Sequence, residues 1–301
     1  MRENIPEFLW NLLTEQYGEE LAEKITDGYV AERAVTLRVN RLKATPEEIK
    51  TQLSQVGIAY EAVDWSEDAL IICGAREEAV RQIPAYEDGG IYLQSLSSMM
   101  PPLCLNLQPK ECILDMAAAP GGKTTQMAAL SGNLAQITAC EKNKARSEKL
   151  KYNLEKQGAS GTYVMVEDAR KLDDFFSFDR ILLDAPCSGS GTVEVRDGVC
   201  RTKISKELVE RSARTQEELL KKALKLLKSG HEMVYSTCSI LKEENEGLLK
   251  RVLKSSGGEL VPIGEEWTKE LPLLPNAMPG TLLVGPDELF EGFFVAKIRK
   301  K

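Results

Sequence analysis

Histidine is nearly absent from this sequence: His231 is the only one in 301 residues. A single histidine excludes most histidine-based metal sites. The seven cysteines are odd in number and contain no Cys-x-x-Cys pair, so neither a disulfide framework nor a zinc site is expected. We therefore expect no bound metal and a reducing compartment, the cytoplasm.

The chain also lacks an unbroken apolar stretch of about 18 residues, the length that a membrane-spanning helix needs. Its N-terminus, MRENIPEFLWNLLTEQ, carries early acidic residues and no continuous apolar core, which argues against a secretory signal. No internal repeat or low-complexity tract is present. We expect a monomer without a membrane partner, long enough for one full-sized domain and a smaller one.

Positive charge is not in excess, since the sequence has 39 Lys and Arg and 46 Asp and Glu, for a net charge of −7. Taken alone, this is a weak argument against nucleic-acid binding, because phosphate contacts need basic side chains. The basic residues are grouped, however, and an acidic protein can still present one basic face. Solvated surface charge is the competing interpretation. The groups are Arg33, Arg38, Arg41 and Lys43, and Arg196, Arg201 and Lys203.

Two regions differ in their pattern. Residues 1–88 predict a small α+β module, and a Gly-Gly pair marks its end. In residues 89–301, apolar strands alternate with helices, which predicts a mostly parallel sheet covered by helices on both faces. Ligands of such sheets bind at the carboxyl ends of the strands. In the first region we expect helices at 6–16 and 18–27, a strand at 36–40, a helix from Pro46, and strands at 58–63 and 69–73. In the second we expect strands at 111–117, 134–141, 162–168, 179–185, 232–238 and 292–298, and helices after Gly122, at 143–157 and at 205–228.

The segment LDMAAAPGGKTT runs from a predicted strand through a glycine turn into a helix. Glycines let the backbone approach a ligand, and a helix N-terminus presents free N–H groups. GGKT resembles the end of a phosphate-binding loop, but the first glycine of that motif would fall at Ala117, and Pro120 lies inside the loop. The segment therefore favours a loop that binds S-adenosylmethionine.

Acidic residues close three consecutive predicted strands beside this loop. Glu141 lies 20 residues after Gly121, where a carboxylate can bond both ribose hydroxyls. Asp168 ends the next strand, where it could meet the adenine amino group, and Asp184 ends the one after. Each acid alone could be a helix cap or a loop residue, but together they predict a cofactor site.

Two cysteines, Cys187 and Cys238, also follow strand ends, in turns rich in Ser, Thr and Gly. If the strands are adjacent, the two thiols lie close together over one pocket. A redox pair is the alternative, and the neighbouring cofactor loop favours catalysis. A lone cysteine is usually a small buried apolar residue, which is our expectation for four others; the role of Cys200 stays open. The four are Cys73, Cys104, Cys112 and Cys140.

Long motifs over nearly the whole chain resemble the RNA cytosine-5 methyltransferases of the NOL1/NOP2/Sun family. They are TLRVNRLK, GIYLQSLSSMMPPLCL, LDMAAAPGGKT, DAPCSGSGT, YSTCSILKEENE and EGFFVAKIRK. The resemblance implies a Rossmann-like α/β methyltransferase domain with a mostly parallel seven-stranded sheet in residues 89–301. It also implies that residues 1–88 form an RNA-binding module with a ferredoxin-like or RRM-like fold. The aromatic-rich strand signature of an RRM is missing there.

The resemblance also implies roles. Cys238, in the TCS motif, is the nucleophile, and Cys187, in the APC motif, assists product release. Attack of a thiolate on carbon 6 of cytosine makes carbon 5 nucleophilic, and a carboxyl group near ring nitrogen 3 stabilises the adduct, which suits Asp184. The cofactor, S-adenosylmethionine, is expected to contact Ala117, Ala118, Ala119, Pro120, Gly121, Gly122, Lys123, Glu141, Arg146, Asp168 and Asp184.

The chain departs from the family pattern in two places. Gly230-His231 replaces the Gly-Gly turn of many members, which makes His231 a turn residue. VEVRDGVCRTKIS, after the APC motif, mixes acids into a stretch that is often basic. The expected partner is ribosomal or transfer RNA, with a lean toward ribosomal RNA. The alternatives are a non-catalytic RNA-binding or assembly factor, and a methyltransferase that acts on a small molecule or a protein.

Overall fold

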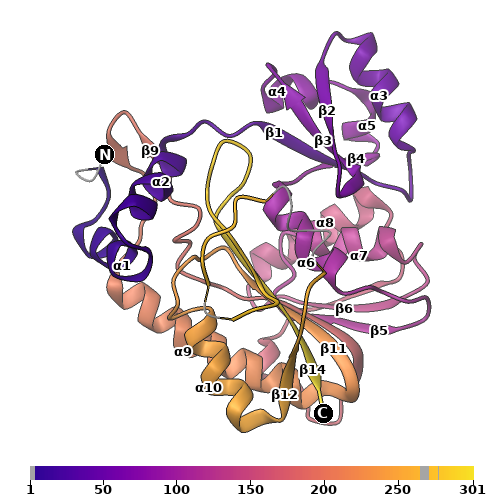
Figure 1. Cartoon of the computed structure of the whole chain (residues 1–301). Helices are drawn as coiled ribbons and strands as arrows, with labels where there is room; N and C mark the ends of the chain where they lie inside the picture. The colour runs from indigo at the N-terminus through magenta and orange to yellow at the C-terminus, as the bar shows by residue number, and fades with distance from the viewer. Residues whose placement is uncertain (1–3, 265–270, 277) are drawn as a thin grey trace. The chain divides into compact units, whose positions relative to one another are not determined.

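Figure 1 shows the computed structural model of the chain, which describes residues 4–264, 271–276 and 278–301. The first three residues of the predicted N-terminal module thus lie outside the described residues. The chain divides into two compact units. The glycine-loop unit comprises residues 34–182 and 226–228, and the cysteine unit comprises residues 1–33, 183–225 and 229–301.

The glycine-loop unit begins with a four-stranded sheet in the order β2-β3-β1-β4, whose neighbours all run antiparallel. The βαββαβ order of its elements is that of a ferredoxin-like fold. β4 completes this sheet and follows the Gly-Gly pair that we used to place a domain boundary, and the boundary itself stays a prediction. The elements are β1 (Val35–Val39), α3 (Pro46–Gln55), β2 (Ala59–Val63), β3 (Ser66–Cys73), α4 (Glu77–Val80), α5 (Pro84–Glu87) and β4 (Ile91–Leu93).

Helix α3 covers one face of this sheet (Figure 1), and its Ile49 and Leu53 are fully buried in the same core as Leu37 of β1. The helix starts where the sequence predicts it, because Thr45 caps the backbone N–H of Glu48 and the Glu48 carboxylate accepts the Thr45 N–H. β1 lies between two strands of the sheet, and successive side chains of a strand point to opposite faces. Every second side chain of β1 therefore faces away from α3.

That opposite face of β1 is also buried, and it carries Arg38, only 3% exposed. The Arg38 guanidinium donates to Gln94 Oε1 (3.0 Å), Thr125 Oγ1 (2.9 Å) and the Gly122 carbonyl (3.3 Å). The last two partners belong to the helix that follows the glycine loop. At β1, therefore, the face that an RRM uses for RNA is occupied by the rest of the unit.

The second sheet of this unit has the order β8-β5-β6-β7 with all strands parallel, so their carboxyl ends meet at one edge. Backbone bonds extend that edge, from Ala118 N to the Cys140 carbonyl (2.9 Å) and from Glu141 N to the Met165 carbonyl (3.1 Å). The elements are α6 (Leu96–Cys104), β5 (Cys112–Asp115), α7 (Gly122–Leu130), β6 (Gln136–Cys140), α8 (Lys144–Gln157), β7 (Thr162–Met165), the 3₁₀ turn η2 (Ala169–Lys171) and β8 (Phe178–Asp184), whose last two residues belong to the cysteine unit.

The cysteine unit is built around β14, which pairs antiparallel with β11, β12 and β13. Every residue of β14 from Phe293 to Ile298 is buried, so this strand forms the core of the unit. The elements are α1 (Glu7–Tyr17), α2 (Glu19–Val30), β9 (Val195–Arg196), β10 (Val199–Cys200), α9 (Lys206–Leu226), β11 (Leu227–Thr237), α10 (Glu246–Ser256), β12 (Gly258–Val261), β13 (Leu282–Val284) and β14 (Phe293–Lys300).

The parallel run and the helices at its faces confirm the predicted α/β class. The sheet that contains this parallel run has eight strands rather than the seven that we predicted, and β14 pairs antiparallel with β11, β12 and β13. His231 lies inside β11, one residue after Gly230 at φ 78°, so the prediction that it sits in a turn before the strand is wrong. Among the described residues, no helix combines the length and the apolar composition needed to cross a membrane.

Candidate active site

The glycine loop links β5 to α7, and Asp115 organises it from inside. Asp115 is only 1% exposed. Its carboxylate accepts hydrogen bonds from the Thr124 hydroxyl (2.7 Å) and the Ala117 N–H (3.4 Å). Gly121 caps α7 with φ 112°, a left-handed conformation that favours glycine. The N–H groups of the first helical turn have no partner inside the helix, so this end of α7 presents donors. We did not predict a role for Asp115, although it ends the first strand of the motif.

Glu141 and Arg146 lie beside the loop, as predicted. The Arg146 guanidinium donates to the Ala119 carbonyl (2.7 Å) and pairs with the Glu141 carboxylate (3.4 Å). The other Glu141 oxygen accepts the Asn143 N–H (2.7 Å), and the residue is only 4% exposed. A carboxylate has about four acceptor positions, more than these two contacts use. Pro120 is tied to α8, since its carbonyl accepts Asn153 Nδ2 (2.7 Å).

The other predicted cofactor residues have protein partners. The Asp168 carboxylate accepts the Arg170 guanidinium at 2.6 Å and the Arg170 N–H at 3.1 Å, which starts the short turn η2. The Arg170 guanidinium lowers the pKa of Asp168 to about 2. Lys123 donates to Ser98 Oγ at 2.7 Å. Asp168 is thus a fixed anion, and Lys123 points to a side chain of α6.

This donor set fits S-adenosylmethionine. A nearly buried carboxylate with spare acceptor positions suits a pair of ribose hydroxyls, and the N-terminus of α7 suits a polar group. The small apolar residues Ala118 and Ala119, each 6% exposed, leave the backbone of the loop as the surface next to a ligand.

In the cysteine unit, the two predicted thiols meet. Cys187 follows β8 and Cys238 follows β11, and their sulfur atoms lie 3.0 Å apart. A backbone bond from Ala185 N to the Ser236 carbonyl (2.8 Å) holds the two strand ends together. The hydrogen bond to the Cys238 sulfur, followed by burial, the charge of Cys238 and the charge of Glu244, raises the pKa of Cys187 well above its usual value. Either sulfur can be the donor of the hydrogen bond between them.

Asp184 ends β8 in the same unit and is half-buried. Its carboxylate accepts the Ser236 hydroxyl at 2.8 Å. Asp184, which we predicted to stabilise the cytosine adduct by proton donation, is therefore held by Ser236 of β11, the strand that Cys238 follows.

A buried carboxylate next to the thiols was missed by sequence reasoning. Glu244 is fully buried and accepts hydrogen bonds from Ser188 and Ser239, which directly follow the two cysteines. The motif YSTCSILKEENE contains Glu244, but three acids within four residues gave no sign of which one accepts hydrogen bonds from the cysteine turns. A serine directly after each cysteine, together with an acid nearby in the sequence, is the signal that could have identified Glu244.

The remaining cysteines divide into two classes. Cys104 and Cys140 are buried, as predicted, and burial raises the pKa of Cys140 to about 12. Cys73 and Cys112 are half-buried, so the prediction of full burial is wrong for both. Both lie at the ends of their strands, where the sheet is less covered. Cys200 is half-buried in the β9–β10 hairpin.

The first basic group does not form the basic face that we considered. Arg38 is buried, Arg41 pairs with Asp68 and Glu67, and Lys43 donates to two backbone carbonyls. In the second group, Arg196 pairs with Glu194, and Arg201 lies 3.8 Å from Asp197. No cluster of three or more His, Cys, Asp or Glu side chains in the described part of the chain could hold a metal ion.

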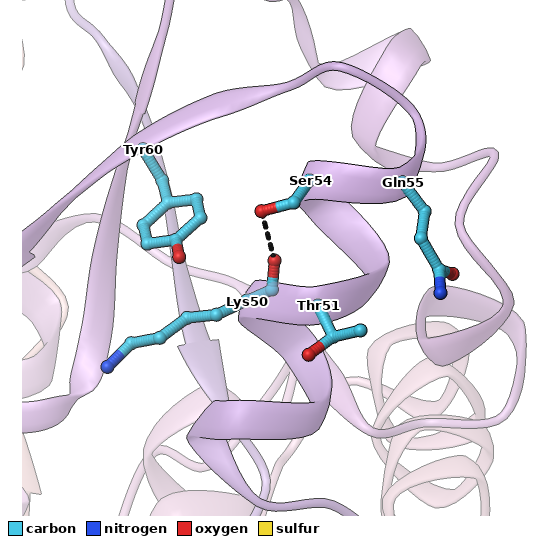
Figure 2. Close-up of a pocket in the computed structure, with 5 residues that line it drawn as sticks. All are labelled: Lys50, Thr51, Ser54, Gln55 and Tyr60. Carbon is cyan, nitrogen blue, oxygen red and sulfur yellow. Dashed lines mark hydrogen bonds between the residues drawn. The ribbon is translucent and has the colours of Figure 1, made fainter.

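A pocket of about 390 Å³ lies on α3 and β2, outside the predicted site residues. Figure 2 shows its lining, in which the Ser54 hydroxyl donates a hydrogen bond to the Lys50 backbone carbonyl (2.9 Å). Lys50 supplies the single positive charge, whereas residues 1–88 contain 18 acidic and 9 basic residues. This setting does not suit phosphate, so we give the pocket no role. The lining residues are Lys50, Thr51, Ser54, Gln55 and Tyr60.

A parallel sheet with a glycine loop at its carboxyl edge, preceded by a ferredoxin-like sheet, defines a Rossmann-like α/β methyltransferase fold. A family model described as 16S rRNA methyltransferase RsmB/F matches residues 102–299. A second, the ferredoxin-like domain of RsmF/B-like methyltransferases, matches residues 5–77. The chain belongs to this RsmB/F family.

Two relatives are named as ribosomal RNA methyltransferases. A ribosomal RNA small subunit methyltransferase F from Shewanella sp. (strain ANA-3) is 36% identical over 276 residues, which cover 88% of this chain and 56% of that protein. A human 28S rRNA (cytosine(4447)-C(5))-methyltransferase is 35% identical over 281 residues, 89% of this chain and 34% of that protein. The chain thus spans about half the length, or less, of these relatives.

In two solved structures, the similarity extends over nearly the whole of both chains. NSun6 from Pyrococcus horikoshii with SFG superposes with a TM-score of 0.88 at 25% identity and covers 100% of this chain and 99% of that one. A methyltransferase homologue from the same organism gives 0.86 at 30% identity, with coverage of 100% and 97%.

Proposed function

We propose that this protein transfers a methyl group from S-adenosylmethionine to carbon 5 of a cytosine in RNA, through a covalent adduct with Cys238. The observation that carries the proposal is the pair of cysteine sulfur atoms, of Cys187 and Cys238, that lie 3.0 Å apart. Ribosomal RNA is the favoured substrate over transfer RNA, because the relatives from Shewanella and human are named as ribosomal RNA methyltransferases.

Cys238 acts as the nucleophile. A hydrogen bond from the protonated Cys187 stabilises negative charge on the Cys238 sulfur, as a donor next to a thiolate does. The Cys238 sulfur adds to carbon 6 of the cytosine, and the electron pair of the 5,6 double bond moves toward carbon 5 and the ring. Asp184, as a carboxylic acid held by Ser236, would give a proton to ring nitrogen 3 and so stabilise the adduct.

The cofactor, when bound, supplies an electrophilic methyl group on a sulfonium. The residues that would hold it are those of the glycine loop from Ala117 to Lys123, together with Glu141, Arg146, Asp168 and Asp184. Glu141 would accept from the ribose, since its buried carboxylate retains acceptor positions. After methylation, a base removes the proton from carbon 5, the double bond re-forms, and the Cys238 sulfur leaves. Cys187, within reach of that sulfur, would reprotonate it and assist release of the product.

Other parts of the proposal concern the setting of the reaction. We propose that the chain works as a monomer in the reducing cytoplasm, where free thiols persist, and that residues 89–301 form the methyltransferase domain. The role of residues 1–88 in RNA binding stays a prediction, and the net charge of −9 on these residues points away from broad phosphate contact.

The test follows methyl transfer from labelled S-adenosylmethionine to RNA that lacks the modification, with wild type, Cys238→Ala and Cys187→Ala. We expect 5-methylcytosine with wild type, neither product nor adduct with Cys238→Ala, and a denaturant-resistant protein–RNA adduct that accumulates with Cys187→Ala. Cys104→Ala, which removes a buried thiol elsewhere, is the control and should resemble wild type.

Two results would overturn the assignment in different ways. Adduct formed by Cys238→Ala but not by Cys187→Ala would exchange the roles of the two cysteines. Tight binding of S-adenosylmethionine without methyl transfer to any RNA would favour the assembly-factor alternative.

A further inference from the structure

Glu244 is a fully buried carboxylate whose hydrogen-bond donors are all neutral. One oxygen accepts the Ser188 N–H (2.8 Å) and Gln216 Nε2 (3.0 Å), and the other accepts the hydroxyls of Ser188 (2.5 Å) and Ser239 (2.6 Å). Burying a charge without a cation is unfavourable unless hydrogen bonds replace its water. Four donors do so here, which indicates a site built around a negative charge.

The donors of Glu244 come from the two turns that carry the thiols. Ser188 directly follows Cys187, and Ser239 directly follows Cys238, so one carboxylate joins both turns. Gln216, from α9, extends the link by donating to the Pro186 carbonyl (3.0 Å), just before Cys187. The backbone carbonyl of Glu244 in turn accepts the buried Tyr235 hydroxyl (2.6 Å). The carboxylate therefore fixes the position of each turn relative to the other.

The charge of Glu244 also acts on Cys187. Glu244 is one of the causes that raise the pKa of Cys187, after the hydrogen bond to Cys238, burial and the charge of Cys238. A neutral group of the same shape could join the turns but would not oppose ionisation of Cys187. This difference separates a positioning role from simple packing.

We propose that Glu244 is a positioning residue whose carboxylate holds the Cys187 and Cys238 turns together, so that the two sulfur atoms stay within hydrogen-bonding distance of each other. The use of this arrangement in catalysis rests on the proposed function. The arrangement itself belongs to the free protein and needs neither RNA nor cofactor to be observed.

The experiment measures the rate of iodoacetamide alkylation of Cys187 and Cys238 between pH 6 and 10, read peptide by peptide with mass spectrometry, on the full chain. Variants are wild type, Glu244→Gln and Glu246→Gln. Glu246 provides a matched control, because it is 1% exposed, lies two residues away, and makes no hydrogen bond through its carboxylate. The alkylation rate reports the thiolate fraction of each cysteine.

In wild type and Glu246→Gln, we expect Cys187 to react mainly at the high end of the pH range, because its pKa is raised. In Glu244→Gln, the Cys187 profile moves to lower pH, by on the order of one unit, which is about tenfold in thiolate fraction. Profiles in Glu244→Gln that match those of Glu246→Gln, with both proteins folded by circular dichroism, would overturn the proposal.

If Glu244→Gln does not fold, Ser188→Ala and Ser239→Ala each remove one link and keep the charge. Each should change the ratio of the Cys187 and Cys238 alkylation rates relative to wild type, and an unchanged ratio in both would also overturn the proposal. A protein that shows the expected thiol profiles but methylates no RNA would contradict the proposed function and leave the role of Glu244 intact.

Discussion

At the scale of single residues, the neighbours rather than the residue type decide what a charged group does. The acids at or after the strand ends of the parallel sheet show this, and Asp168, which we predicted to end a strand, instead caps the turn η2, three residues after β7 ends at Met165. Asp115 shapes the glycine loop, Glu141 keeps acceptor positions beside it, and Asp168 is held by Arg170. The same side-chain chemistry therefore serves loop structure, ligand binding and local stability at one edge of the sheet.

Asp168 contributes stability that depends on pH. Its pKa is lowered from 3.8 to about 2, so the folded state is favoured above pH 4 and this advantage is lost as the pH falls from 4 to 2. We expect Asp168→Asn to lower the free energy of unfolding at pH 7 by about 1–2 kcal/mol, allowing for partial solvent screening of the pair. Urea denaturation at pH 7, 5 and 3 should show the difference from wild type shrinking at the lowest pH.

Asp173→Asn, at an exposed position, is the control and should change the unfolding free energy little at any of these pH values. A destabilisation of Asp168→Asn that is the same at pH 7 and pH 3 would contradict the ion-pair explanation, since an ion pair needs the ionised carboxylate.

At the scale of elements, the turn after Cys187 is held by contact between two backbones. Gly292 N donates to the Gly191 carbonyl at 2.8 Å, just before β14 begins. Gly191 N in turn donates to the Cys238 carbonyl at 3.0 Å. The Cys187 turn, the Cys238 turn and the core strand β14 are therefore connected through one glycine.

Gly191 cannot be replaced without moving that backbone. A Cβ at Gly191 would lie 2.0 Å from the Gly292 carbonyl oxygen. We expect Gly191→Ala to lower the free energy of unfolding by more than about 2 kcal/mol, in the range of severe steric substitutions. Thermal denaturation compares it with Gly132→Ala, where the new methyl group meets no atom and left-handed strain costs about 1 kcal/mol. Equal destabilisation of both variants would exclude the clash with Gly292 as the cause.

At the scale of the whole molecule, charge is unevenly distributed along the chain. Residues 1–88 contain 18 acidic and 9 basic residues, a net charge of −9, while residues 89–301 contain 28 and 30, a net charge of +2. Lys203, Arg211 and Arg214 are exposed in and just before α9, and none forms an ion pair with another described residue. The surface that meets RNA phosphates is therefore expected in residues 89–301.

Replacing these three cations tests that expectation. The triple variant Lys203→Ala, Arg211→Ala and Arg214→Ala should weaken binding to single-stranded RNA and reduce the salt dependence by about 0.7 in the log–log slope for each phosphate that the variant no longer neutralises. The matched triple variant Lys24→Ala, Lys50→Ala and Arg76→Ala removes the same charge from residues 1–88 and should bind nearly as wild type. The opposite ranking, measured by fluorescence anisotropy at several salt concentrations, would assign the phosphate contacts to the N-terminal module.

Much of the fold could be read from local pattern. The helix at Pro46 begins where Thr45 and Glu48 form a capping box, and the apolar strands of residues 89–301 fall where expected. Some of the elements missed were short, such as β4 with three residues and the β9–β10 hairpin, but α10, with 11 residues and a buried apolar face, was missed as well. β4 is a strand because β1 lies beside it, which is information that no window of the sequence contains.

The sequence by itself determined the motifs whose meaning is local: a glycine turn between a strand and a helix, acids at strand ends, and two cysteines each followed by a serine. These patterns persist because backbone conformation and the alternation of side chains depend on near neighbours. Only the tertiary structure decided that Arg38 is buried rather than part of a basic face, that the thiols lie 3.0 Å apart, and that Glu244 joins their turns. Such contacts depend on packing between distant segments, and the free energy of burying a charge is known only once its partners are in place.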